Sequence, residues 1–159
     1  MDPSQDNNDA VSTAIEKYSD MVRRICFLYL KDRADIEDVF QEVFIKLFLH
    51  KVPFESEQHQ KAWICRVTFN KCKDMCKSFW HRRVVSIEDT EIPYENPEQA
   101  ELLDAVLKLP PDHRQVIYLH YYEGRSIPEI AGLMNKKLNT AYTLLGRAKE
   151  RLRKRVGDI

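Results

Sequence analysis

Residues 107–135 of the chain read LKLPPDHRQVIYLHYYEGRSIPEIAGLMN, and residues 147–156 read RAKERLRKRV. Pro110 closes one predicted helix, because the residue before a proline disfavours helical backbone. A second helix is expected to begin near Asp112 and to stop at Gly124, since glycine commonly terminates a helix. This stretch therefore predicts a series of helices and no strand.

A capping box with a first-turn proline, formed by Ser126, Pro128 and Glu129, predicts the start of another helix. A short turn over residues 135–139 separates it from a last predicted helix over residues 139–156. Together they form a helix-turn-helix pattern, whose second helix enters the major groove of DNA. The residues expected to face the core of this domain are Leu138, Ala141, Leu145, Ala148 and Leu152.

The last predicted helix carries basic residues outside its apolar stripe. Cations near a helix C-terminus complement the helix dipole, so these residues alone do not distinguish a structural role from phosphate contact. The capped helix and the turn before them favour contact with DNA phosphates. The residues are Arg147, Lys149, Arg151, Arg153, Lys154 and Arg155.

Upstream of residue 107 the apolar residues also recur with helical spacing. The stretch 84–96 has no such period and is acidic, so we expect a flexible linker there. We predict an all-α fold of two small helical domains, residues 1–83 and 97–159, joined by this linker. The helices expected upstream are residues 11–31, 36–49, 61–83 and 97–109, with a loop at residues 51–60.

The formal net charge of zero conceals segregated blocks of charge. Residues 51–84 carry a net charge of +5 and residues 113–159 a net charge of +6, whereas residues 85–112 carry −7. Two basic blocks separated by an acidic segment favour two separate contacts with a polyanion.

Three of the four cysteines, Cys65, Cys72 and Cys76, lie in one predicted helix, and Cys72 and Cys76 share a face of it. A metal site with His81, or a redox switch, is one interpretation. Paired CxxC spacing, the strong zinc signal, is absent. We therefore favour reduced thiols packed as small apolar side chains, and we predict neither a metal site nor a cofactor.

No apolar stretch of about 18 residues is present, so no transmembrane helix is predicted. The polar N-terminus lacks the basic and apolar regions of a signal peptide, which favours a cytoplasmic protein. The sequence has no glycine-rich phosphate loop, HExxH motif or GxSxG motif. We therefore expect neither an enzyme nor a small-molecule substrate.

Residues 107–156 resemble region 4 of the bacterial sigma factor family, which reads the minus-thirty-five promoter element. Family members often carry Lys or Arg early in the last helix, where this chain has Ala141, Tyr142, Thr143 and Leu144. Tyr142 and Thr143 can still contact phosphates, base edges or a thymine methyl group. The residues assigned to this element are Arg125, Thr140, Tyr142, Thr143, Arg147, Lys149 and Arg151.

Residues 35–48, DIEDVFQEVFIKLF, resemble region 2.2 of that family, the helix that docks on the clamp of RNA polymerase. An exposed acidic and amide face suits pairing with basic residues of a partner, and Phe40 or Phe44 would provide an apolar anchor. An ordinary solvated helix face is the alternative for this motif taken alone. The predicted polymerase contacts are Asp38, Gln41, Glu42 and Phe44.

Residues 61–83, KAWICRVTFNKCKDMCKSFWHRR, resemble regions 2.3 and 2.4, which open the minus-ten element and hold its non-template strand. Cations track the strand backbone, and aromatic faces stack unpaired bases. By this analogy Asn70 and the loop at residues 51–61 form a pocket for a flipped base, whereas core packing is expected for Trp63. The residues assigned to the minus-ten element are Arg66, Asn70, Lys71, Lys73, Lys77, Arg82 and Arg83.

The resemblance covers residues 11–156, and only regions 2 and 4 are present, which indicates the extracytoplasmic-function class of sigma factors. It implies an initiation factor that binds the clamp and flap of core RNA polymerase, directs the enzyme to promoter DNA and opens that DNA. It also implies an anti-sigma factor, membrane-anchored or free, as a partner. Two alternatives stay open: a sigma-like adaptor or anti-sigma protein, and another helix-turn-helix regulator, which would explain residues 113–156 alone.

Overall fold

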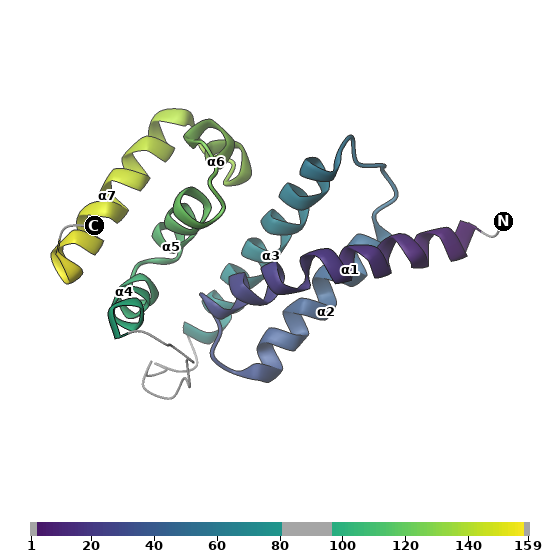
Figure 1. The fold of residues 1–159 in the computed structure, drawn as a ribbon, viewed down its shortest axis with the longest axis horizontal. Coiled ribbons are helices and arrows are strands. Elements are labelled where there is room, and N and C mark those ends of the chain that lie inside the picture. The colour runs from purple at the N-terminus through teal and green to yellow at the C-terminus, as the bar shows by residue number, and fades with distance from the viewer. Residues whose placement is uncertain (1–2, 81–96, 158–159) are drawn as a thin grey trace. The chain divides into compact units, whose positions relative to one another are not determined.

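The structure is a computed structural model that describes residues 3–80 and 97–157. It divides into two compact units, Met1–Val85 and Ser86–Ile159. Every secondary-structure element within the described residues is helical, which confirms the predicted all-α fold (Figure 1). The expected linker at residues 84–96 lies outside the described residues, so its flexibility stays a prediction.

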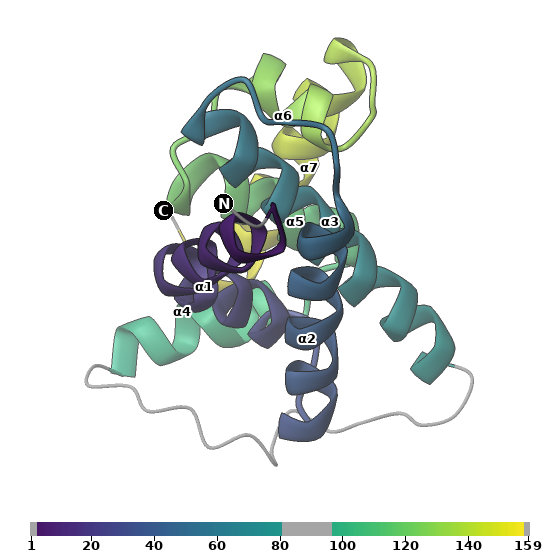
Figure 2. The same cartoon turned by 90° about the vertical axis from the view of Figure 1, so that its right-hand side faces the viewer.

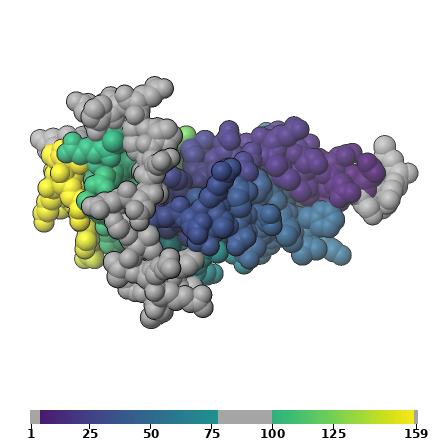
Figure 3. Space-filling view, turned by 90° about the horizontal axis from the view of Figure 1, so that it is seen from below, coloured from purple at the N-terminus to yellow at the C-terminus, as the bar shows by residue number. Residues whose placement is uncertain are grey.

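The N-terminal unit is a bundle of three helices in which each packs against the other two (Figure 1, Figure 2). They are α1 (Pro3–Phe27), α2 (Arg33–Leu49) and α3 (Glu57–Trp80). In the space-filling view α1 and α2 lie side by side along one face of this unit (Figure 3). Its fully buried side chains include Val22, Ile25, Val39, Val43, Ile64 and Phe69.

All three helices begin earlier than the apolar pattern predicts, because polar residues contribute to their first turns. α1 starts at Pro3, and most of its first two turns are exposed. α3 starts at Glu57, where the Ser56 hydroxyl accepts a hydrogen bond of 3.0 Å from the His59 amide. α2 starts at Arg33, three residues before the predicted start, and the Asp32 carboxylate accepts a bond of 3.0 Å from the Ala34 amide.

The C-terminal unit consists of α4 (Pro97–Leu107), α5 (Pro111–Ile117), the π-helical turn η2 (Tyr118–Tyr122), α6 (Ile127–Leu133) and α7 (Leu138–Val156). α7 packs against α4, α5 and α6. The π-helical turn η2 was not expected from the sequence. It continues α5, and the Glu123 amide donates to the Tyr118 carbonyl at 3.1 Å. The segment ends at Gly124, as predicted, with a φ of +66°.

The capping box that opens α6 is confirmed. The Ser126 hydroxyl accepts from the Glu129 amide, and the Glu129 carboxylate accepts from the Ser126 amide at 3.2 Å. The turn before α7 holds Asn135 at a φ of +53°. Four of the five predicted inward residues of α7 are buried: Ala141, Leu145, Ala148 and Leu152.

Leu138 is the exception among these five, with 46% of its surface exposed. It is the first residue of α7, so it lies beyond the part of the helix that the rest of the unit covers. The prediction of a core position for Leu138 is therefore wrong, and this residue joins the exposed start of α7.

Candidate nucleic-acid and partner interfaces

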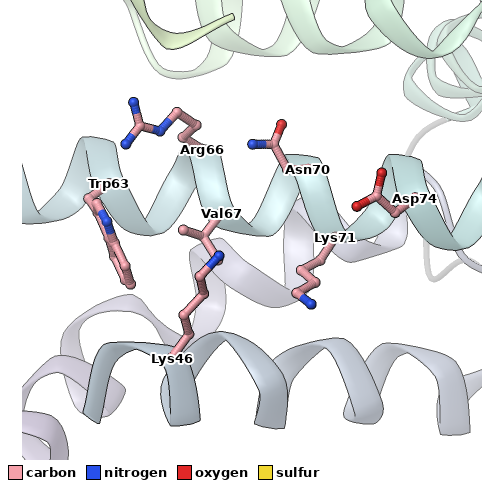
Figure 4. A pocket seen from close by; sticks show the side chains of 7 residues that line it. All are labelled: Lys46, Trp63, Arg66, Val67, Asn70, Lys71 and Asp74. Atoms are coloured by element: carbon pink, nitrogen blue, oxygen red, sulfur yellow. The ribbon is translucent and has the colours of Figure 1, made fainter. Parts of the chain in front are cut away.

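A pocket of about 380 Å³ lies along α3 beside α2. Lys46 extends from α2 toward α3, while Arg66 and Asn70 leave α3 on the side away from α2 (Figure 4). Three cationic side chains and one carboxylate give the pocket a positive balance, which suits an anionic or hydrogen-bonding ligand. The residues that line it are Lys46, Trp63, Arg66, Val67, Asn70, Lys71 and Asp74.

The structure thus brings together three of the predicted minus-ten residues, Arg66, Asn70 and Lys71. Lys46 was missed, because its place in the pocket depends on how α2 packs on α3 and not on any local pattern. Lys77 is exposed and Lys73 half-buried on α3, outside the pocket lining. Arg82 and Arg83 lie outside the described residues.

An aromatic cluster fixes the connection between α2 and α3 next to this pocket. The rings of His50 and Phe54 stack with centroids 4.7 Å apart, and the Trp63 ring lies 4.8 Å from that of His50. The Phe54 ring also meets His59 at 5.4 Å. Trp63 is half-buried and reaches the pocket, so the expected core position is corrected to a wall between the core and the pocket.

α2 presents an acidic and amide surface that continues into an apolar one. Asp38, Gln41 and Glu42 are exposed, as the docking prediction requires. Ile45 and Leu49 follow them at spacings of three and four and are 56% and 62% exposed. We call these five residues the α2 face.

Phe44, which was predicted as the apolar anchor of this surface, is only 5% exposed. Its ring packs 4.8 Å from that of Phe40, and the Arg23 guanidinium covers the Phe40 ring at 4.2 Å. Neither aromatic ring is therefore presented to a partner, and Phe44 is corrected to a core residue. The exposed apolar residues on this side of α2 are instead Ile45 and Leu49.

Negative charge is concentrated at the start of α2. Burial, and then the nearby carboxylates of Asp32 and Asp38, raise the pKa of Asp35 above its ordinary value. Glu42, farther along the helix, forms an ion pair of 3.3 Å with Lys71 of the pocket. This pair directly connects the α2 face to the pocket on α3.

The predicted minus-thirty-five residues of α7 fall into two rows, and all but the half-buried Lys149 are exposed. Thr140, Thr143, Arg147 and Arg151 recur at spacings of three and four, so they share one face of the helix. The Thr143 hydroxyl also donates to the carbonyl oxygen of Asn139 at 3.0 Å.

The second row consists of Tyr142 and Lys149, which are seven residues apart. The Lys149 ammonium lies 5.6 Å from the centre of the Tyr121 ring. Tyr121, an exposed residue of η2, is a neighbour of this row that the sequence did not reveal.

Two charged groups near α7 are held by the unit itself. The Arg125 side chain is only 13% exposed and lies 3.1 Å from the Glu129 carboxylate, so it belongs to the start of α6 more than to the surface. Burial, and then the positive charges of Arg151 and Arg147, lower the pKa of His113 from its ordinary value. The positive charge of this surface therefore comes from the arginines more than from His113.

Comparison with known proteins follows the same division into two units. Residues 14–82 match the family model of Sigma-70 region 2, and residues 99–152 match that of Sigma-70, region 4. The ECF RNA polymerase sigma factor SigW of Bacillus subtilis is 26% identical, over 96% of this chain and 92% of that protein. The ECF RNA polymerase sigma factor SigE of Mycolicibacterium smegmatis is 30% identical, over 87% of this chain and 58% of that protein.

Solved structures share the fold. CnrH in complex with the cytosolic domain of CnrY has a TM-score of 0.66 at 22% identity, covering 95% of this chain and 90% of that one. The sigma factor RpoE in complex with the anti-sigma factor NepR from Bartonella quintana has a TM-score of 0.70 at 19% identity, covering 90% and 94%.

A helical bundle with regions 2 and 4 in this order defines a transcription initiation factor. The chain belongs to the sigma-70 family, in its extracytoplasmic-function class. No helix among the described residues is long and apolar enough to cross a membrane.

Proposed function

We propose that the chain docks on core RNA polymerase through the α2 face and captures the minus-ten strand in the pocket on α3. Its region-4 unit would contact the minus-thirty-five element through α7. The observation that carries this proposal is the adjacency of two surfaces of different chemistry, joined by the Glu42–Lys71 ion pair of 3.3 Å. One surface suits a basic partner, and the other suits nucleic acid.

The α2 face combines charge with apolar contact area. Exposed carboxylates attract a basic partner helix and orient it. Ile45 and Leu49 supply exposed apolar area beside them, and removing such apolar surface from water is a favourable term in most protein–protein association. The clamp of core polymerase is the partner we assign to this face.

The pocket on α3 has the groups that an unpaired nucleotide needs. The Asn70 amide can donate to and accept from a base edge, and Arg66, Lys71 and Lys46 can contact phosphates. The Trp63 wall offers an aromatic surface for stacking. We therefore assign the minus-ten strand to this pocket and add Lys46 to its contacts.

On α7, Arg147 and Arg151 would contact phosphates, while Tyr142 and Thr143 would reach base edges or a thymine methyl group. Lys149, whose ammonium lies beside the Tyr121 ring, would contact the DNA at the edge of this surface. Thr140 stands at the exposed start of the helix, where recognition helices usually meet bases. Arg125 is bonded to Glu129, so its contribution would be indirect.

Catalysis in this proposal belongs to the polymerase, so the chain itself needs no cofactor and no small-molecule substrate. It would act in the cytoplasm, where polymerase and DNA are. Two solved neighbours are complexes, one with the cytosolic domain of CnrY and one with the anti-sigma factor NepR. We therefore propose an anti-sigma factor as the regulatory partner of this chain, with the flap of the polymerase as a further contact of region 4.

Run-off transcription tests the proposed function. The purified chain is mixed with core bacterial RNA polymerase and fragmented DNA of the source genome, and the transcripts are sequenced. Discrete start sites preceded by two spaced upstream motifs are expected. The Asn70→Ala variant should lose most open complexes while it retains polymerase binding, and the matched Asn8→Ala variant, exposed on α1, should behave as the unchanged chain.

Binding to core polymerase without any transcript would favour a sigma-like adaptor or an anti-sigma protein. Absence of polymerase binding would exclude the docking assignment altogether. Equal activity of the Asn70→Ala variant would remove the pocket from the mechanism.

A further inference from the structure

Three cysteines gather where α1 packs on α3, apart from the surfaces assigned above. Cys26 of α1 and Cys72 of α3 are both 0% exposed, and the two thiols are close enough for Cys26 to shift the pKa of Cys72. Cys76, one turn after Cys72, is half-buried, and its thiol donates to the carbonyl oxygen of Tyr29 at 3.3 Å. The thiols of two buried cysteines are therefore next to one that solvent can reach.

The three thiols differ in their access to an oxidant. The hydrogen bond with Cys26, and then burial, raise the pKa of the Cys72 thiol well above its ordinary value. Burial keeps a dissolved oxidant from Cys72, so Cys72 cannot react first, and it can react only with a sulfur held beside it. Cys76 has the exposure that Cys26 and Cys72 lack.

We propose that Cys76, Cys72 and Cys26 form an oxidation site in which a peroxide reacts at Cys76 and a disulfide finally joins Cys72 to Cys26. Burial of Cys26, Cys65 and Cys72 agrees with the packing role expected for them. The half-exposed Cys76 is the feature that gives this cluster a chemical function.

In the first two steps, one peroxide molecule oxidises two thiols to a disulfide. The Cys76 sulfur attacks one peroxide oxygen, the O–O bond breaks, and the second oxygen leaves as water with the thiol proton, which yields a sulfenic acid. The Cys72 sulfur then displaces the hydroxyl group from the Cys76 sulfur, and its proton leaves with that group as a second water. Two electrons pass from the sulfur atoms to the peroxide.

Helix geometry makes the resulting Cys72–Cys76 disulfide transient. Cβ atoms four residues apart on a helix are about 5–6 Å apart, whereas disulfides hold Cβ atoms at about 3.5–4.5 Å. Cys26 faces Cys72 from the neighbouring helix. Its sulfur can attack Cys72, and Cys76 leaves as a thiol that takes up the proton of Cys26. The product is a disulfide between α1 and α3.

This disulfide would restrain the backbone beneath the pocket, because Cys72 directly follows Asn70 and Lys71. It would also close a long loop that contains α2. A cross-link of this kind reduces the entropy of the unfolded chain. Oxidised protein should therefore unfold at a temperature higher by roughly 5–10 °C than the same protein after reduction with dithiothreitol.

Disulfide mapping tests the site. The full-length protein is treated with hydrogen peroxide, the remaining thiols are alkylated, and the digest is analysed by mass spectrometry without reduction. The expected product is a Cys26–Cys72 cross-link with Cys76 alkylated. In the Cys76→Ser variant the cross-link should form at least about tenfold more slowly, since Cys76 is the thiol of this cluster that a dissolved peroxide can reach.

Cys65→Ser is the matched control, because Cys65 lies seven residues before Cys72 on the same helix, about 10 Å along its axis. Its rate of cross-linking should equal that of the unchanged chain. The proposal is overturned if Cys76 accumulates as sulfinic acid with Cys26 and Cys72 still reduced, or if Cys76→Ser forms the cross-link at the normal rate. Either result is independent of polymerase and promoter binding.

Discussion

Arg125 and Arg147 carry the same charge but have different environments. The Arg125 side chain is 13% exposed and bonded to Glu129 at 3.1 Å, whereas Arg147 is exposed on the first row of α7. A guanidinium that already pairs with a carboxylate neutralises little phosphate charge and so releases few counterions from DNA. An exposed guanidinium that contacts a phosphate releases about one. The environment of each residue, more than its charge, therefore decides which arginines are suited to the proposed contact with promoter DNA.

Arg147→Ala should weaken binding to duplex DNA that contains the upstream element, and it should lower the slope of log affinity against log salt by about 0.9. Fluorescence anisotropy at several salt concentrations measures both effects. Arg153→Ala is the control, because Arg153 is 3.3 Å from Glu150 and lies off the first row. An unchanged slope in Arg147→Ala would show that this residue contacts no phosphate.

Ser126→Ala should destabilise the C-terminal unit by about 1 kcal/mol, because it removes the side-chain acceptor at the start of α6. The Ser126 hydroxyl is also the first cause that lowers the pKa of Glu129 below its ordinary value of 4.5. The carboxylate therefore stabilises the folded unit above about pH 4.5, and this contribution is lost as pH falls through the lowered pKa.

The difference in unfolding temperature between the unchanged chain and Ser126→Ala should accordingly shrink below pH 4. The shrinkage should be small, since Glu129 is half exposed and solvent screens its interactions. Ser12→Ala, at an exposed position of α1, provides the comparison. A difference that stays constant with pH would mean that the hydroxyl alone carries the effect.

At the scale of the element, α2 shows how one helix serves two purposes. One side buries Val39, Val43, Phe44 and Leu47 in the bundle. The α2 face on the opposite side runs from carboxylates to exposed apolar side chains. A monomer does not need Ile45 or Leu49 exposed for its own stability, which supports a partner on this face.

Asp38→Arg combined with Glu42→Arg should reduce affinity for core polymerase by at least about tenfold at low salt, because it reverses the charge that meets a basic partner. Both residues are exposed, so the circular dichroism spectrum and the unfolding temperature should stay close to those of the unchanged chain. Glu101→Arg, on the exposed side of α4, serves as the control. Normal polymerase affinity in the double variant would exclude the α2 face as the docking surface.

Local signals predicted the elements of the C-terminal unit well. The capping residue Ser126 and the stop at Gly124 are coded within a few residues of sequence, and both are found as expected. The start of α1 could not be predicted, because its first turns are largely exposed and show no apolar stripe. The π-helical turn η2 depends on how Tyr118 and Leu119 are buried by the rest of the unit.

The candidate site was predicted only in part, because it depends on the packing of two helices. Arg66 and Asn70 are four residues apart on one helix, so their common side follows from spacing alone, whereas Lys71 points toward α2 (Figure 4). Lys46 and the wall formed by Trp63 become part of the pocket only when α2 and the His50–Phe54 ring pair pack against α3. Phe44 was wrongly predicted on the surface. It lies in the apolar run Val43–Phe44–Ile45, and such a run does not show which of its residues faces the core.

At the scale of the whole molecule, the two proposed activities of region 2 are in contact. Glu42 belongs to the α2 face and Lys71 to the pocket, and their ion pair of 3.3 Å would compete with a phosphate for the Lys71 ammonium. A polymerase that engages Glu42 would release Lys71 for DNA. Binding of the two partners would then be favourably coupled, and by linkage each would strengthen the other equally.

Glu42→Gln should therefore raise the affinity of the free chain for a single-stranded minus-ten oligonucleotide. The expected gain is no more than about threefold at low salt, because an exposed ion pair contributes less than about 1 kcal/mol, and it should vanish at high salt as screening removes the pairing. Anisotropy titrations with and without core polymerase measure the coupling, which the variant should reduce.

Glu37→Gln provides the matched control, because Glu37 lies on the same helix but pairs with Arg23 at 3.4 Å, away from the pocket. Its affinity for the oligonucleotide should rise only slightly, because the variant removes one negative charge far from the pocket. If the two variants gain equally, net charge explains the effect and the Glu42–Lys71 pair has no special role. If Glu42→Gln alone gains and also loses its coupling to polymerase, the pair connects docking on polymerase to capture of the strand.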